Sequence, residues 1–178
     1  MDSWHPRRLA RVAPAVFAEP YRQFEWPFHP HAAIVTPRGT ILVFDNGNNR
    51  SRPFEPRVAA RDNHSRAVEY AVDPGDMTVA EVWQYSGPEA DRFYSPIVGD
   101  ADPLRKTGNV LVTAGARAFD ENGVPTDSVA DAVIWATISE VTRNEPAERV
   151  FEVIVGDPDF PAPGWIVYRA ERLPGLYP

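Results

Sequence analysis

Residues 66–85, RAVEYAVDPGDMTVAEVWQY, decide the fold of this chain. Apolar and polar residues alternate in two runs, 66–72 and 78–85, and the turn signal Pro74-Gly75-Asp76 separates them. A period of two is typical of strands with one buried face. A short turn between two such runs predicts an antiparallel hairpin.

Two further strands are expected upstream of this hairpin. Residues 32–36 form a short apolar run, and residues 40–45 (TILVFD) are rich in β-branched and aromatic side chains. Pro37-Arg38-Gly39 is a turn signal between them, and a polar loop rich in Asn, Arg and Pro follows from residue 46 to about 64. Four antiparallel strands with one long loop are the content of a β-propeller blade.

The same series recurs downstream. Strands are expected at about 97–100, 109–113, 131–141 and 148–155, again with a polar loop between the second and the third. Gly39 and Gly108 are 69 residues apart, and Met77 and Ala147 are 70 apart. Because two independent pairs of positions agree, the spacing indicates an internal repeat.

The sequence therefore predicts an all-β chain that forms part of a β-propeller. We expect an irregular, Pro-rich lead-in (1–30), a four-stranded antiparallel blade (31–86), a second such blade (93–156) and a closing strand, WIVYRAER (165–172). Propellers usually close with about four to eight blades. Two blades would expose apolar faces, so we expect missing upstream blades, assembly of several copies, or packing of the two sheets as a sandwich.

Composition narrows the function classes. The chain has 178 residues, no cysteine, 18 basic and 25 acidic residues, and a net charge of −7. Disulfides, thiolate metal sites and a cysteine nucleophile are excluded. The acidic balance argues against a nucleic-acid partner, since phosphate contacts need Lys and Arg. No apolar run approaches the roughly 18 residues of a membrane helix, so we expect no membrane insertion, and no signal peptide is expected within this chain.

Three pairs of segments, read together, resemble the bacterial aryl-sulfate sulfotransferases. They are His31-Ala32-Ala33 with FDNGN (44–48), SRAVEY (65–70) with VWQY (82–85), and FYSP (93–96) with GNVLVT (108–113). Their order and spacing match over residues 28–115, and VYRAE (167–171) is similar to the closing strand of that family.

This resemblance implies an activity and a location. The family is six-bladed and extracytoplasmic, either periplasmic or secreted, and it moves a sulfuryl group from a phenolic sulfate ester to a phenol. It uses no nucleotide donor, and no cofactor is expected. The implied route is ping-pong, through a sulfohistidine. A neutral imidazole suits this role because it is nucleophilic near neutral pH.

The resemblance also assigns the nucleophile. The family's histidine before the FDNG strand is His31 here. The family usually has Gln just before it, whereas this chain has Pro30, so His29 is a competitor. His29 and His31 point to one side of an extended segment. A metal pair is the alternative, but no third ligand is near in the sequence, so we expect no metal.

Four other residues are candidates for substrate binding: Tyr168, Arg169, Ser95 and Asn46. Asn46 lies in an Asp-Asn-Gly turn, for which a purely structural role is the alternative. Residues 99–102 (GDAD) are expected to form a polar bend. A group of arginines could be a solvated loop or an anion-attracting rim: Arg50, Arg52, Arg57, Arg61 and Arg66.

The sequence thus predicts a sulfotransferase-like domain that acts on small phenolic substrates. Its missing blades would carry most of the groups that stabilise charge, so we expect a truncated domain with little activity alone. The alternative is a non-catalytic, propeller-like binding or interaction module. A hydrolase or lyase on the same scaffold is a third hypothesis, because a fold does not fix a function.

Overall fold

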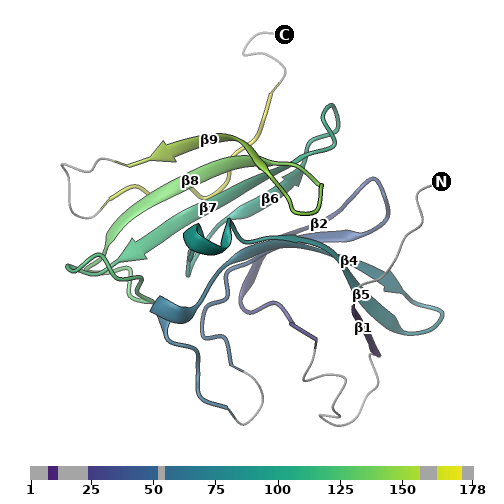
Figure 1. Cartoon of the computed structure of the whole chain (residues 1–178), viewed down its shortest axis with the longest axis horizontal. Helices are drawn as coiled ribbons and strands as arrows, with labels where there is room; N and C mark the ends of the chain where they lie inside the picture. Colours follow the sequence, from purple (N-terminus) through teal and green to yellow (C-terminus); the bar gives the residue numbers. More distant parts are fainter. Residues whose placement is uncertain (1–7, 12–23, 52–54, 157–163, 174–178) are drawn as a thin grey trace.

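The computed structural model describes residues 8–11, 24–51, 55–156 and 164–173, and in these residues the regular structure is β-sheet with two short 3₁₀ helices. The strands form two separate antiparallel sheets (Figure 1). The 3₁₀ helices are η1 (Ala60–Asp62) and η2 (Glu89–Asp91). The all-β prediction is therefore confirmed.

The first sheet has the strand order β1-β5-β4-β3-β2. Its strands are β1 (Arg8–Arg11), β2 (Pro30–Val35), β3 (Ile41–Asp45), β4 (Arg66–Asp73) and β5 (Thr78–Tyr85). Strands β2 to β5 are the four predicted for the first blade, and each pairs with the next along the chain. Strand β1 lies in the lead-in that was expected to be irregular, and it pairs with the outer strand β5.

The second sheet has the order β6-β7-β8-β9. Its strands are β6 (Asp100–Pro103), β7 (Val110–Phe119), β8 (Val133–Val141) and β9 (Arg149–Val155). Strand β6 begins where the expected strand ends, so the predicted polar bend at 99–102 lies mostly within a strand. The two four-stranded meanders, with no closed barrel, fit two partial propeller blades.

The segment 165–172, expected to be a closing strand, has no regular strand pairing in the structure. Two backbone hydrogen bonds attach its first part to the second sheet. The Trp165 amide donates to the Ile134 carbonyl over 3.1 Å, and the Val167 amide donates to the Gly115 carbonyl over 2.9 Å. Gly115 makes this approach feasible, because a Cβ there would lie 2.0 Å from the Val167 oxygen.

The main core lies between the two sheets. Both sheets contribute apolar side chains, and β6 lies against β2 and β3. The outer strands β1 and β9 lie far apart (Figure 1), so the two sheets are close at their inner strands and diverge toward their outer strands. The buried residues of this core are Leu42, Phe44, Ala67 and Tyr85 from the first repeat, and Phe93, Ala101, Val110, Val112, Ala114 and Val141 from the second.

Strand β4 is buried on both faces, although its alternating sequence predicted one solvated face. Arg66 is fully buried, and its guanidinium is bonded to Asp45 over 3.0 Å and to Glu81 over 3.0 Å. Glu69, 1% exposed, pairs with Arg143 of the second repeat. Charged side chains that are paired can be buried, so alternation alone misjudged this strand.

These ion pairs also change the interpretation of the arginines. Arg50 is 8% exposed and is bonded to Glu25 and Asp45. Arg50 and Arg66 therefore stabilise the first sheet and form neither a solvated loop nor a rim. Arg52 lies outside the described residues, whereas Arg57 and Arg61 are exposed.

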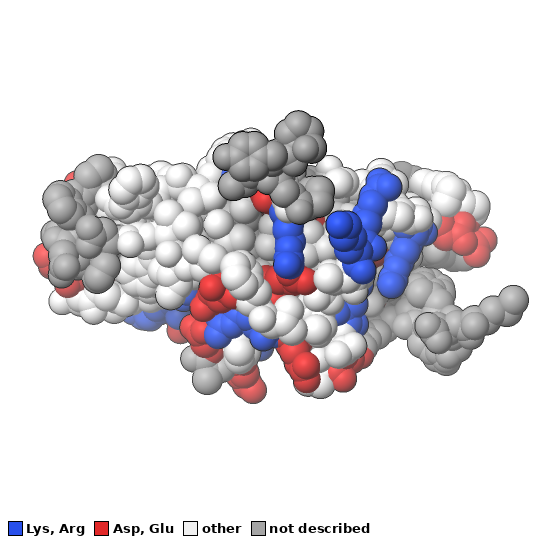
Figure 2. Space-filling view, turned by 90° about the horizontal axis from the view of Figure 1, so that it is seen from above, with Lys and Arg blue, Asp and Glu red and all other residues white. Residues whose placement is uncertain are grey.

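Apolar side chains remain exposed at the outer edge of the second sheet. On β9, Val150, Phe151, Val153 and Ile154 are between 39% and 65% exposed. Trp165, at the start of the C-terminal segment, is 59% exposed. Figure 2 shows that the face seen from above carries groups of acidic side chains beside groups of basic ones. No helix among the described residues is long and apolar enough to cross a membrane.

Candidate functional site

A pocket of about 250 Å³ opens where the innermost strands of the two sheets, β2 and β6, meet. Strand β2, the start of β6 and the C-terminal segment each contribute residues. They are His31, Ala32, Ala33, Ile34, Gly99, Asp100, Asp102, Tyr168 and Arg169. We call this the His31 pocket.

His31 is held in this pocket by Asn46. The His31 Nδ1 atom lies 2.6 Å from the Asn46 Oδ1 atom. Asn46 is fully buried, and its Nδ2 group donates to the Ser95 carbonyl over 2.7 Å and to the Val98 carbonyl over 2.6 Å. Carbonyl oxygens only accept, so these two contacts fix which end of the amide carries the nitrogen.

The orientation of Asn46 determines the tautomer of His31. Since Oδ1 can only accept, Nδ1 of His31 must carry the proton that it donates. In the neutral imidazole the other nitrogen, Nε2, then keeps its lone pair. The structure thus describes a half-buried histidine whose Nε2 is available as a nucleophile or ligand.

The backbone around this histidine adopts unusual conformations. His29, Ala32 and Val98 have φ angles of 51°, 52° and 50°. Positive φ is uncommon outside glycine, and in a β-branched residue such as Val98 it is an outlier. The pairing of β2 with β3 also shifts register between His31 and Ile34. Bulges and strained residues are frequent where a strand must aim a side chain into a site.

Asp45, next to Asn46, stabilises the Asp-Asn-Gly turn at residues 45–47. It is fully buried and accepts from the Phe28 amide over 2.7 Å and the Gly47 amide over 2.9 Å. Its other oxygen receives Arg66. Gly47 has a φ of 73°, and a Cβ there would lie 2.1 Å from the His64 carbonyl oxygen. The Asp-Asn-Gly sequence is therefore a structural turn that also places Asn46 beside His31.

A model of the arylsulfotransferase (ASST) family matches residues 8–156, which is most of the chain. The chain belongs to the arylsulfotransferase family. It is 33% identical over 116 residues to the arylsulfate sulfotransferase AssT of Lelliottia amnigena, and 37% identical over 116 residues to the AssT of Escherichia coli O6:H1. Each match covers 64% of this chain and 19% of the relative, so the chain spans about a fifth of their length.

In this arylsulfotransferase-family chain, two of the predicted binding residues line the His31 pocket. Tyr168 is 67% exposed there. Arg169 lies 3.5 Å from an oxygen of Asp100 and 2.8 Å from one of Glu171. His29, the predicted competitor of His31, is exposed and does not line the pocket.

Ser95 does not line the pocket. It is fully buried, its hydroxyl donates to the Ile97 carbonyl over 3.1 Å, and the Ala116 amide donates to it over 2.9 Å. Its carbonyl receives Asn46. Ser95 thus connects the site to β7. The Asn46 amide makes three hydrogen bonds within the protein, to His31, Ser95 and Val98.

Sequence reasoning missed Asp100 and Asp102. Both line the His31 pocket. The signal was present, because residues two apart on a strand point to the same face. Burial raises the pKa of Asp100 to about 6, and the neighbouring Asp102 carboxylate adds to the rise. The pKa of Asp102 is raised as well, chiefly by burial.

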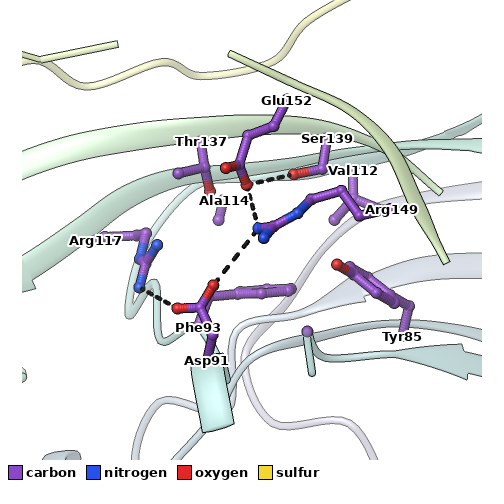
Figure 3. Close-up of a pocket in the computed structure, with 11 residues that line it drawn as sticks. Tyr85, Asp91, Phe93, Val112, Ala114, Arg117, Thr137, Ser139, Arg149 and Glu152 are labelled. Carbon is purple, nitrogen blue, oxygen red and sulfur yellow. Dashed lines mark hydrogen bonds and ion pairs between the residues drawn. The ribbon is translucent and has the colours of Figure 1, made fainter. Parts of the chain in front are cut away.

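A second hollow lies between the sheets, away from His31 (Figure 3). Two ion pairs join across it at Asp91, with Arg149 at 3.5 Å and Arg117 at 3.9 Å. Arg149 also pairs with Glu152. The cavity is about 10 Å³, which suits one water molecule at most. The ion pairs of Asp91 help to hold the sheets together. The cavity offers no room for a substrate.

No group of three or more His, Asp or Glu side chains that could hold a metal ion occurs among the residues that the structure describes.

Proposed function

We propose that this chain takes part in sulfuryl transfer from phenolic sulfate esters to phenols, with His31 as the covalent nucleophile. Membership of the arylsulfotransferase family supports sulfuryl transfer in general terms. The observation that supports the finer proposal is the contact between His31 Nδ1 and Asn46, because in the neutral imidazole it leaves the lone pair on Nε2.

The proposed chemistry has two half-reactions. In the first, the Nε2 lone pair attacks the sulfur, an N–S bond forms, and the S–O bond to the phenol breaks. The phenolate leaves, and the Nδ1 proton stays between His31 and Asn46, which stabilises the positive ring. In the second, the oxygen of an acceptor phenol attacks the same sulfur and loses its proton, which balances the proton taken up by the phenolate released in the first, and the N–S bond breaks to restore neutral His31.

The size of the pocket supports small substrates. Pockets for drug-sized ligands begin at about 300 Å³. At about 250 Å³, the His31 pocket suits a single aromatic ring with a sulfuryl group. Tyr168 offers an aromatic surface at its mouth.

The decisive experiment is an intact-mass measurement after incubation with 4-nitrophenyl sulfate. We expect a gain of one sulfuryl group in the wild type, mapped to the peptide that contains His31. The His31→Ala variant is expected to form no adduct, and His29→Ala is the matched control that keeps it. An adduct on His31→Ala, or none on the wild type, would show that the proposal is wrong.

A binding module without catalysis is the second candidate. Arg169 is the only Lys or Arg among the described residues that line the pocket, and it is already paired with two carboxylates. A sulfate ester brings negative charge that needs cations or donors. Binding of 4-nitrophenyl sulfate without release of nitrophenol or adduct would favour this candidate.

Full activity, in this proposal, needs groups beyond the described pocket. Further blades or further copies of the chain would supply them, and the exposed apolar side chains of β9 support such packing. Native mass spectrometry would separate a closed oligomer from a monomer. An extracytoplasmic location is part of the same proposal and comes from the family resemblance alone.

A further inference from the structure

The His31 pocket contains a buried carboxylate that the sulfuryl-transfer scheme has not used. Asp100 is 4% exposed and lines the pocket at the start of β6. One of its oxygens, Oδ1, accepts from the Ala101 amide over 2.9 Å. The other, Oδ2, is buried and has no hydrogen-bond partner.

An unsatisfied buried carboxylate oxygen is costly, so its presence asks for an explanation. The nearest cation is Arg169, whose Nε lies 3.5 Å from Oδ2, beyond good hydrogen-bond distance. Arg169 also pairs with Glu171, so its positive charge is shared between Asp100 and Glu171. A proton on Oδ2, or a hydroxyl that donates to it, would satisfy this atom.

The backbone holds Asp100 in this place. Gly99 precedes it with a φ of 120°, and a Cβ there would lie 2.5 Å from the Phe44 ring and 2.9 Å from the Thr113 carbonyl oxygen. The chain therefore enters β6 against the core with no side chain between. As a result, β6 presents Asp100 to the same pocket as His31.

We propose that Asp100 is the acid–base residue that exchanges a proton with the phenol oxygen on either side of sulfuryl transfer to His31. This inference rests on the proposed function. In the first half-reaction, protonated Asp100 gives its proton to the leaving phenolate. In the second, the Asp100 carboxylate takes the proton of the acceptor phenol. One turnover returns both His31 and Asp100 to their starting states.

The charges around Asp100 suit this exchange. Asp102 on the same strand and burial favour the protonated form, whereas Arg169 favours the carboxylate. Glu171 raises the pKa of Asp102. His31 lines the same pocket as Asp100 from β2. With a pKa of about 6, Asp100 can hold or release a proton near neutral pH.

The test compares two donors in the Asp100→Asn variant. Phenyl sulfate releases a strongly basic phenolate, whereas 4-nitrophenyl sulfate releases a weakly basic phenolate that can leave without a proton. Both rates are measured at pH 5, below the Asp100 pKa of about 6, where Asp100 carries its proton. We expect Asp100→Asn to slow adduct formation from phenyl sulfate by about 100-fold, the lower end for general acid catalysis. With 4-nitrophenyl sulfate the rate should stay within a few-fold of the wild type.

The pH profile is the second readout. Wild-type adduct formation from phenyl sulfate should fall as the pH rises through about 6, because Asp100 loses its proton there. Asp100→Asn should lack this limb. Asp102→Asn, the matched control, should keep the donor difference and move the limb to lower pH, because a repelling carboxylate is gone.

The outcomes separate the two proposals. Equal slowing of both donors, or no slowing of either, with an adduct still formed on His31, overturns the role of Asp100 alone. No adduct on the wild type from either donor overturns the proposed function and the role of Asp100 with it. An unfolding curve for Asp100→Asn identifies any loss caused by misfolding, in which case Asp100→Glu, which keeps the titrating group, is expected to restore the donor difference.

Discussion

At the scale of single residues, the arrangement of Asn46 is the most informative feature of the site. Its amide makes three hydrogen bonds, and each has a fixed direction because the two carbonyls can only accept. The buried position removes competing water. One side chain thereby selects the protonated nitrogen of the neutral His31 ring, and so selects Nε2 as the atom that would react in the proposed mechanism.

Asn46→Ala is expected to retain a sulfuryl adduct on His31 but to lose its regiochemistry. Without Oδ1 the Nδ1–H tautomer is no longer favoured, so the sulfuryl group should appear on both ring nitrogens. The rate should fall by about 10- to 100-fold, since a lost orienting bond typically costs a few kcal/mol. Two-dimensional NMR of the labelled imidazole measures both. Asn48→Ala in the same loop is the control, and an unchanged Nε2 adduct in Asn46→Ala would contradict the role.

His64 gives a pH dependence at the same scale. Burial, with help from Arg50, lowers the pKa of His64 from 6.5 to about 4, against the opposing charge of Glu25. Between these values the unfolded chain binds more protons than the folded one. The contribution of His64 to stability is therefore complete above pH 6.5 and is lost as the pH falls toward 4.

We expect His64→Asn to flatten this dependence. The difference in unfolding free energy between wild type and variant should change by on the order of 3 kcal/mol between pH 7 and pH 4. Urea unfolding at several pH values measures it. Asp100 acts in the opposite direction, because its raised pKa stabilises the fold at low pH and the gain is lost as the pH rises from about 4 to 6. For that reason the contribution of His64 is the unfolding free energy of the wild type minus that of His64→Asn at each pH, because the contribution of Asp100 is common to both proteins and cancels.

At the scale of elements, the bulge in β2 determines where His31 points. Ala32 has a φ of 52°, which costs a non-glycine residue about 1 kcal/mol. The register of β2 against β3 shifts between His31 and Ile34. An unstrained strand would keep regular pairing and turn the ring to a different direction.

Ala32→Gly is expected to raise the free energy of unfolding by about 1 kcal/mol, because glycine adopts this conformation without strain. Ala33→Gly, one residue on and without positive φ, should lower it by about 0.5–1 kcal/mol. Urea denaturation of both variants is the measurement. If both substitutions change stability in the same direction, the strain assigned to Ala32 is wrong.

The elements also show how far the sequence alone could lead. Period-two patterns and turn residues predicted seven of the eight meander strands, because these signals are local, whereas β6 begins where the expected strand ends. The buried charges of β4 were missed, since the partners of Arg66, such as Glu81 and Glu25, come from other parts of the chain. Substrate binding by Asn46 stays a prediction, and its contact with His31 was missed, because it depends on the carbonyls of Ser95 and Val98, some fifty residues away.

At the scale of the whole molecule, the two sheets pack face to face and leave their outer edges apart (Figure 1). Apolar residues on β9 remain exposed, and the interface between the sheets is secured by ion pairs such as Arg143 with Glu69. A ring of such blades would cover the free faces of the two sheets. The prediction of a partial propeller is consistent with this arrangement.

The seating of Asn46 has a mechanical consequence. His31 belongs to the first sheet, whereas the two carbonyls that hold Asn46 come from the segment that leads into the second. A small slip of one blade against the other would release the amide while every strand stayed intact. The proposed reactivity of His31 would then depend on the alignment of the two blades. Mild denaturants would abolish adduct formation at His31 at concentrations below those that unfold the sheets.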